Sequence, residues 1–356
     1  MIIPELPDFL TQLGGADKKG FIISLFTFSA ALSRPFSGKL ADTIGRVPVM
    51  VVGVTVSMIC GLLYPFFASV SLFFILRFAH GFSTGFKPTG TTAYLADIVP
   101  VHKRGQAMGI LGVAASSGMA LGPAIGSYIA YYFSLNIMFF ASSFMAFVSL
   151  LTIAFMQETL LVKQKLDWSF FKISINDFFD PLVKLPAVVM ILTAYSFGII
   201  LTIVPDLCAY TGVQNKGTFF LVFVFSSIIM RLIACSLSDK IGRKKALFVG
   251  CLVLIFGMYF MGVVNSAVDL YIGAFLLGLA AGINSPVIFA WTIDLANSNH
   301  RARAMATVYV AMEIGIGLGA FVSGWVYGND PIMFRAVFWI GAVMAMLAFS
   351  VLSLFD

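Results

Sequence analysis

Long apolar segments alternate with short polar breaks along most of this chain. Eleven segments reach about 20 residues, the length that a helix needs to cross the hydrocarbon of a bilayer. Most breaks between them are short, so neighbouring helices are expected to run antiparallel. The pattern predicts an all-α, multi-pass membrane protein whose helices cover 20–40, 47–68, 71–98, 105–133, 136–157, 183–206, 217–238, 246–265, 268–295, 303–327 and 333–354.

The composition agrees with a membrane location. The 356 residues are 60% hydrophobic and 11% charged, with a mean hydropathy of +0.99. A soluble domain carries roughly 25% charged residues. The net charge of +6 comes from short basic clusters between apolar runs, which are typical of topology signals and do not indicate nucleic-acid binding. The four cysteines lack the spacing of a metal or redox site, and no metal site is expected.

Lysine and arginine are distributed unequally between the two predicted sides. Sixteen fall on one side and four, Lys18, Lys19, Lys216 and Arg335, on the other. The positive-inside rule therefore places the first set in the cytoplasm, together with the C-terminus. The location expected is a cell membrane, here the bacterial inner membrane. The sixteen are Arg34, Lys39, Arg46, Lys103, Arg104, Lys163, Lys165, Lys172, Lys184, Arg231, Lys240, Arg243, Lys244, Lys245, Arg301 and Arg303.

The longest polar break divides the chain into two halves. It covers 158–182 and is interpreted as a cytoplasmic linker between a first bundle, 1–157, and a second, 183–356. The halves match at one fixed offset, because Asp239 follows Asp42 by 197 residues (239 − 42). The same shift relates pairs of Arg, Leu, Gly, Asp and Met residues across four helices. Small residues at helix crossings could explain the glycines alone; the paired Asp and Arg positions favour an internal duplication.

The repeated segment resembles a known family signature. Gly38-Lys-Leu-Ala-Asp42-Thr-Ile-Gly45-Arg46 is similar to the loop between helices 2 and 3 of the major facilitator superfamily. The second copy runs from Cys235 to Arg243 and has Cys235 where the family usually has Gly. The resemblance covers nearly the whole chain. It implies two six-helix bundles around a shared central site.

The loop motif has a physical interpretation as a conformational latch. Gly45 and Gly242 permit a tight turn between two helices, and Gly38 permits a close contact between helices. By resemblance, Asp42 would accept hydrogen bonds from the start of helix 11, near 302–305, and so close the cytoplasmic side. Arg46 would pair with Asp97, and Arg243 with Asp294. The alternative is that the arginines serve topology only. The predicted latch comprises Gly38, Asp42, Gly45, Arg46, Asp97, Asp239, Gly242, Arg243 and Asp294.

A glycine motif in the fifth predicted helix is similar to one associated with antiporters. Gly118, Gly122 and Gly126 recur every four residues and share one face, and Pro123 bends the helix. Ser127 stands where the family motif ends in Gly. The motif allows close helix packing in any case. By resemblance it points to drug:proton antiporters of the tetracycline and multidrug type.

Arg77, Lys87 and Glu313 fall inside predicted helices, and each is a candidate for the proton or substrate pathway. Arg77 lies about 9 Å from the outer surface and could snorkel to it; the resemblance favours a role in proton movement. Lys87 lies about 24 Å along the same helix. Glu313 lies about 15 Å into a core roughly 30 Å thick. It is the predicted coupling carboxylate, with Lys87 the nearest plausible cation in depth; a structural glutamate is the alternative.

These observations predict a secondary transporter, not an enzyme. The function expected is proton-coupled efflux of small organic molecules or drugs by alternating access. Uptake of a nutrient or metabolite by symport or facilitated diffusion is the alternative within transport, and a non-transporting or incomplete membrane protein the alternative outside it. The expected partners are a small-molecule substrate, protons and the lipid bilayer, with no nucleic acid. No cofactor is expected beyond the proton gradient, and the protein is expected to be monomeric.

The first transmembrane helix is expected to be mostly missing from the chain. Residues 2–6, Ile-Ile-Pro-Glu-Leu, resemble 203–207, Ile-Val-Pro-Asp-Leu, at the end of the seventh helix. That helix has 22 residues, 183–204, before its proline, against three before Pro4. About 19 residues would therefore be missing by comparison with a complete helix of this kind.

Overall fold

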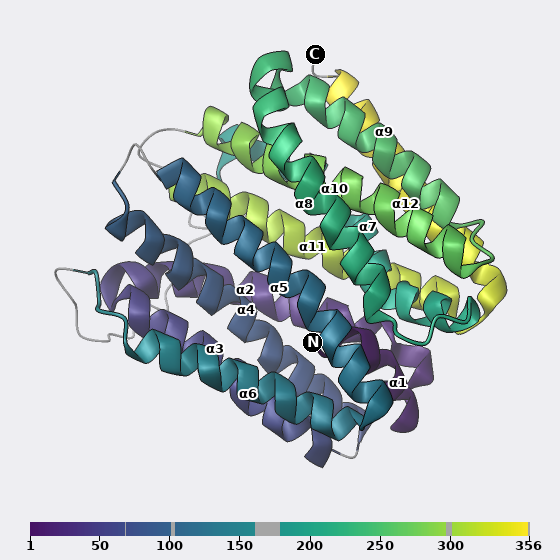
Figure 1. Ribbon diagram of the computed structural model, residues 1–356. Helices are drawn as coiled ribbons and strands as arrows, with labels where there is room; N and C mark the ends of the chain where they lie inside the picture. Colours follow the sequence, from purple (N-terminus) through teal and green to yellow (C-terminus); the bar gives the residue numbers. More distant parts are fainter. Residues whose placement is uncertain (68, 101–103, 161–178, 297–300, 355–356) are drawn as a thin grey trace.

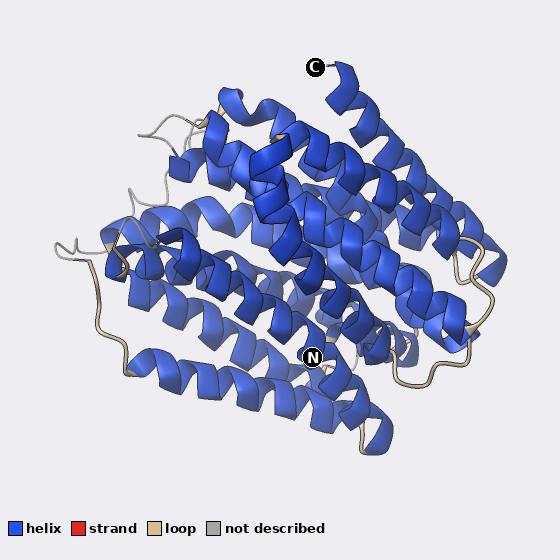
Figure 2. Ribbon diagram, turned by 45° about the horizontal axis from the view of Figure 1, so that its top comes forward, coloured by secondary structure: helices blue, strands red, loops and turns tan. Residues whose placement is uncertain are grey.

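The computed structural model describes residues 1–67, 69–100, 104–160, 179–296 and 301–354. These residues form helices and loops (Figure 2). Most of the predicted linker, 161–178, lies outside them, so the boundaries of the two halves stay a prediction. The α-helices are α1 (Leu6–Gln12), α2 (Gly20–Thr43), α3 (Arg46–Leu63), α4 (Val70–Ile98), α5 (Arg104–Tyr132), α6 (Leu135–Ala154), α7 (Lys184–Tyr210), α8 (Gly217–Ile241), α9 (Arg243–Met261), α10 (Ala267–Leu295), α11 (Arg301–Tyr327) and α12 (Phe334–Leu354).

The prediction of an all-α membrane fold is confirmed. Within the described part, nine helices, α3 and α5 to α12, are long and apolar enough to span a membrane. The other two of the eleven predicted segments are α2 and α4, with 24 and 29 residues. They are long enough but less apolar, because they bury polar side chains inside the protein. Arg34 is buried on α2 and Arg77 on α4.

The duplication is visible where helices begin and turn. Gly45 and Gly242, one repeat apart, occupy the α2–α3 and α8–α9 turns with φ of 137° and 94°. These backbone conformations disfavour side chains with a Cβ, so glycine is required there. Ser69 and Ser266, also 197 residues apart, accept hydrogen bonds from backbone N–H groups at the starts of α4 and α10.

The duplication extends to helix packing. A Cβ added to Gly81 of α4 would collide with the carbonyl oxygen of Phe26 on α2. A Cβ added to Gly278 of α10 would collide with the equivalent oxygen, that of Phe223 on α8. Gly278 follows Gly81 by 197 residues, and Phe223 follows Phe26 by the same number. The same close crossing is therefore built twice, once in each half.

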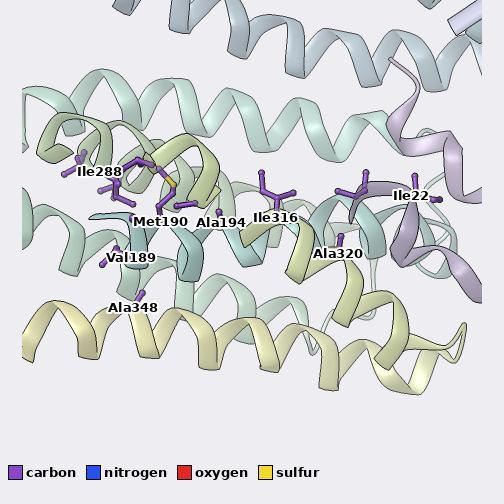
Figure 3. Packing of buried hydrophobic residues seen from close by; sticks show 14 of the residues in the cluster. Ile22, Val189, Met190, Ala194, Ile288, Ile316, Ala320 and Ala348 are labelled. Carbon is purple, nitrogen blue, oxygen red and sulfur yellow. The ribbon is translucent and has the colours of Figure 1, made fainter. Parts of the chain in front are cut away.

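The two halves share one core. Figure 1 shows the first half, coloured from purple to teal, beside the second half, from green to yellow. One apolar cluster runs from Ala348 of α12 through Met190 of α7 and Ile316 of α11 to Ile22 of α2 (Figure 3). A Cβ added to Gly20, at the start of α2, would lie 3.2 Å from the Cα of Gly324 on α11. The halves are thus in contact at the end of the molecule predicted to face outward.

Candidate functional site

A charged pair joins the two halves in the protein interior. Arg34 Nη2 of α2 lies 2.6 Å from Glu313 Oε1 of α11, and the two residues are 9% and 4% exposed. The guanidinium of Arg34 also lies over the ring of Tyr309, 4.7 Å from its centre. Removal of one partner of such a buried ion pair strongly destabilises a protein, because the other charge is left uncompensated. The pair therefore couples the packing of α2 to that of α11.

Two interpretations of these residues were wrong. Arg34 was counted with the cytoplasmic basic residues, although it lies inside the predicted segment 20–40. The structure extends α2 to Thr43, which moves Arg34 further from the helix end and into the core. Lys87 was considered as the cation nearest to Glu313 in depth. The carboxylate pairs with Arg34 instead, because depth along a helix does not specify which neighbour a side chain faces.

Arg77 is held inside the first half. Its Nε donates to the carbonyl oxygen of Ile22 at 3.0 Å, and Nη1 donates to Tyr64 Oη at 3.2 Å. Its guanidinium lies 4.4 Å from the ring centre of Phe26. With 1% of its surface exposed, Arg77 does not snorkel, so that interpretation was wrong. These contacts tie α4 to α2 and to the end of α3; a role in proton movement stays a prediction.

Lys87 lines a cavity of about 370 Å³ in the first half, together with several serine and threonine side chains. Ser57 and His80 also line it, and Ser57 Oγ lies 3.2 Å from His80 Nε2. A second cavity of about 260 Å³ lies between α5 of the first half and α7 to α11 of the second. The two cavities are related by the repeat. The shift of 197 carries Ser57, His80, Thr84, Lys87 and Pro88 of the first onto Leu254, Leu277, Ala281, Asn284 and Ser285 of the second.

The second cavity is mostly apolar and contains one arginine. Arg231, the repeat counterpart of Arg34, lines it together with Ser116, the counterpart of Glu313. Asn284 lies on α10 and donates from Nδ2 to the carbonyl oxygen of Gly250 at 3.3 Å. Methionine and phenylalanine side chains make up much of the wall, and such flexible or flat apolar groups suit organic ligands.

The predicted pairs of the loop motif are present. Arg46 Nε lies 3.1 Å from Asp97 Oδ2 and Nη1 lies 2.7 Å from Asp42 Oδ1. In the second copy, Arg243 Nε lies 2.9 Å from Asp294 Oδ2, and Nη1 lies 2.5 Å from Asp239 Oδ1. Each arginine therefore links its turn to the end of the fourth helix of its own half.

Two details of the predicted latch differ in this conformation. The Asp42 side chain is 71% exposed and binds Arg46, so it is not buried against the start of α11. A Cβ added to Gly38 would meet nothing within 4 Å in the described structure. The close helix contact expected at Gly38 is therefore not formed. The expected role of Asp42 as a latch stays a prediction for another conformation.

Glu158 completes the first turn and was missed by the sequence analysis. Its Oε1 accepts from Arg46 N at 3.0 Å and its Oε2 from Val47 N at 3.1 Å, at the start of α3. Partial burial acts to raise the pKa of Glu158, but four backbone hydrogen bonds outweigh burial and lower it below the usual value. A carboxylate at a helix N-terminus is stabilised by the same backbone N–H groups. No sequence signal linked a residue 112 positions away to this turn.

Ion pairs join the two halves at the predicted outer end. Lys19 Nζ, before α2, lies 2.6 Å from Asp206 Oδ2 on α7. Lys216, the repeat counterpart of Lys19, lies before α8 and pairs with Asp8, and its Nζ is 3.7 Å from Glu5 Oε2. Both lysines thus cross to the other half. The sequence analysis counted them only as outer basic residues.

The glycine motif of α5 faces the N-terminal residue. A Cβ added to Gly126 would collide with the carbonyl oxygen of Met1, and one on Gly122 would lie 3.1 Å from Met1 N. The expectation of close packing fails at Gly118, where an added Cβ meets nothing within 4 Å in the described part. Pro123 lies against Gly217 of α8. Ser127, which replaces the last glycine of the motif, donates to Glu5 Oε1 at 2.6 Å.

Comparison with known proteins places the chain among transporters. The family model described as Major Facilitator Superfamily matches residues 1–205 and 186–356. The multi-drug resistance efflux pump PmrA of Streptococcus pneumoniae is 30% identical, over 99% of this chain and 90% of that protein. The multidrug resistance protein MdtG of Klebsiella pneumoniae is 27% identical, over 99% and 89%. A D-xylose-proton symporter structure superposes with a TM-score of 0.79 at 16% identity, over 99% of this chain and 92% of that one.

Proposed function

The chain belongs to the major facilitator superfamily, and from this membership we propose that it exports small organic molecules in exchange for protons. It is a multi-pass membrane transporter and not an enzyme. The direction of transport and the coupling to protons are the proposed parts. Relatives at about 30% identity over nearly the whole chain are named as multidrug efflux pumps, which supports export.

The observation that carries the proposal is the buried pair of Arg34 and Glu313. Glu313 is a carboxylate in the middle of α11, and its partner belongs to the other half of the protein. When Glu313 is ionised, the pair holds α2 against α11. When Glu313 is protonated, it no longer attracts Arg34 electrostatically, and the two helices can separate. Loss of a buried ion pair corresponds to roughly 3–5 kcal/mol, which is enough to reverse the populations of two conformations.

The placement of the other ion pairs supports alternating access. Lys19 and Lys216 bind across the halves at the predicted outer end. Arg46 and Arg243 bind within their own halves at the opposite end. The contacts of Lys19 and Lys216 with the opposite half must therefore break for the halves to part on the outer side. With the predicted orientation, this conformation is closed to the outside, and export proceeds from a state of this kind to one open outward.

The experiment is transport into inside-out membrane vesicles with a panel of drug-like dyes and an imposed pH gradient. The proposal expects accumulation that requires the gradient and releases protons from the vesicle lumen. Glu313→Gln keeps the size of the side chain but cannot titrate, so we expect loss of gradient-driven accumulation with exchange of substrate retained. The matched control is Asp17→Asn, which removes an exposed acid and is expected to leave transport unchanged. Gradient-driven accumulation by Glu313→Gln with normal proton release would refute the assignment, and proton and substrate movement in the same direction would indicate uptake.

A further inference from the structure

The buried carboxyl group of Glu5 shares its cation with a second acid. Glu5 ends the short 3-10 helix Ile3–Glu5 before α1 and is 7% exposed. Its Oε2 lies 3.7 Å from Nζ of Lys216, which belongs to the second half and is itself buried. Asp8, at the start of α1, makes the closer contact with the same ammonium group. One lysine of the second half therefore serves two carboxylates of the first.

The equivalent site across the interface pairs one cation with one carboxylate. Asp206 is the counterpart of Glu5, because the segments that contain them resemble each other and lie 201 residues apart (206 − 5). Lys19 Nζ lies 2.6 Å from Asp206 Oδ2. The same spacing of 201 residues carries Asp8 onto Ala209, which has no charge. The second acid is therefore a feature of the Glu5 site and not of the repeat.

The charges around Glu5 favour the binding of a proton. In the described structure, the charged side chains that act on Glu5 are those of Asp8 and Lys216. Counted over these three residues, the cluster carries one net negative charge when both acids are ionised. Cys208 of α7 is also within electrostatic reach of Glu5, but a thiol is uncharged at neutral and acidic pH. Asp206 acts on Lys216 and adds a further negative charge. A proton on the buried carboxylate would neutralise the cluster.

The contacts of Glu5 accommodate a neutral carboxyl group. Ser127 of α5 donates from Oγ to Glu5 Oε1 at 2.6 Å, and this hydrogen bond does not require a charged acceptor. Lys216 lies near the other oxygen and can remain with Asp8 when that oxygen takes up a proton. The Asp8 side chain is 50% exposed, so water at the predicted outer end reaches the cluster. The ammonium group already lies against both carboxylates, which favours a proton over a metal cation as the ligand.

We propose that Glu5 is a proton-binding site of the outer end and that its protonation favours opening of this end. With Glu5 ionised, Lys216 is attracted to two carboxylates of the other half. With Glu5 protonated, the half-exposed Asp8 is left to hold Lys216, and water screens that pair more strongly. The closed conformation is therefore stabilised at neutral pH and destabilised as the outer pH falls. The inference goes beyond the proposed export, since it concerns the outer closure and holds for either direction of transport.

The test measures the separation of the two halves at the outer end as a function of pH. Nitroxide labels are attached to cysteines introduced at Ser71 of α4 and at Asn265 before α10, two exposed residues of different halves, in a background without native cysteines. Pulsed electron paramagnetic resonance on the full chain in lipid nanodiscs gives the ratio of long to short distances. Between about pH 8 and pH 5 we expect this ratio to rise at least about fivefold. Glu5→Gln, which cannot titrate, should lose this rise.

Two further variants separate Glu5 from other titrating groups. Asp8→Asn leaves Lys216 to Glu5 alone, so a lower pH should be needed to open the outer end. Asp17→Asn removes an exposed acid and is the matched control, expected to leave the midpoint unchanged. A wild type without a pH response, or a midpoint that Asp8→Asn does not move, overturns the inference. A rise that persists in Glu5→Gln also overturns it and assigns the response to another group such as Glu313, which leaves the proposed export intact. Opening by sodium ions at constant pH, in place of protons, would likewise overturn the proton site.

Discussion

Lys19 Nζ lies 2.6 Å from Asp206 Oδ2, and this ion pair joins the first half of the chain to the second. The repeat places an equivalent lysine, Lys216, before α8, where it pairs with Asp8 and Glu5 of the first half. Each half thus supplies one copy of this lysine, and each copy binds an acidic residue of the other half. Lys19 and Asp206 have side chains only 11% and 12% exposed, so water screens this pair less than it screens a surface pair.

We predict that the double variant Lys19→Gln with Lys216→Gln opens the outer end. Hydrogen bonds to charged groups contribute roughly 1.5–3 kcal/mol, so their loss should raise the outward-open population about tenfold or more. The measurement is the labelling rate of a cysteine introduced at Thr27 by an impermeant reagent added outside, in a background without native cysteines. Thr27 is 3% exposed and lies on α2 against Gly317. The control is Lys18→Gln, at an exposed neighbour; equal labelling in both variants would show that the ion pairs do not close this end.

The orientation in the membrane can be tested at two exposed residues. Lys245 follows the α8–α9 turn, and Asn265 lies between α9 and α10. Because one helix separates them, cysteines at these positions should lie on opposite sides of the membrane. We expect an impermeant thiol reagent to label Asn265→Cys in intact cells and Lys245→Cys only after permeabilisation. The opposite result would invert the predicted topology. Lys216 is unsuitable for this test because it is buried.

The repeated turns should respond unequally to the same substitution. Gly45→Ala and Gly242→Ala both place a side chain at positive φ, a strain of roughly 1–3 kcal/mol. A Cβ at position 45 would also collide with the Glu158 carboxylate, whereas one at position 242 meets nothing within 4 Å in the described structure. Gly45→Ala should therefore lower the melting temperature of the purified protein more than Gly242→Ala does. Adding Glu158→Ala to Gly45→Ala should bring the loss of melting temperature down to that of Gly242→Ala. If the difference in melting temperature between the two glycine variants stays unchanged, Glu158 is not its cause.

The sequence was informative where a single helix or a single repeat determines the structure. The turns at Gly45 and Gly242 and the pairs of Arg46 and Arg243 follow from spacing within one copy, and duplication supports each of them twice. Contacts between the halves could not be predicted in this way. Whether Arg34 meets Glu313, or Lys19 meets Asp206, depends on how each helix is rotated and how the two bundles dock. Hydrophobic periodicity gives depth along a helix but leaves that rotation open when a helix is apolar on most of its surface.

The last prediction separates the structural and coupling roles of Arg34 and Glu313. Arg34→Gln leaves the Glu313 carboxylate buried without its cation, which should destabilise the protein by roughly 3–5 kcal/mol. Glu313→Gln leaves Arg34 without its anion, but the guanidinium still lies over the Tyr309 ring, and cation–π contacts retain about 0.5–2 kcal/mol. We therefore expect Glu313→Gln to be the milder single change. The double variant removes both charges, so its stability should exceed that of Arg34→Gln.

Transport then distinguishes the two roles. If Glu313 carries the coupling proton, the double variant should regain folding and substrate exchange but not accumulation driven by the pH gradient. If the pair only holds α2 to α11, the double variant should regain gradient-driven accumulation along with stability. The measurements are melting temperature in detergent and the ratio of gradient-driven uptake to exchange in proteoliposomes. A double variant no more stable than Arg34→Gln would contradict the ion pair itself, because an uncompensated Glu313 would then not be the source of the instability.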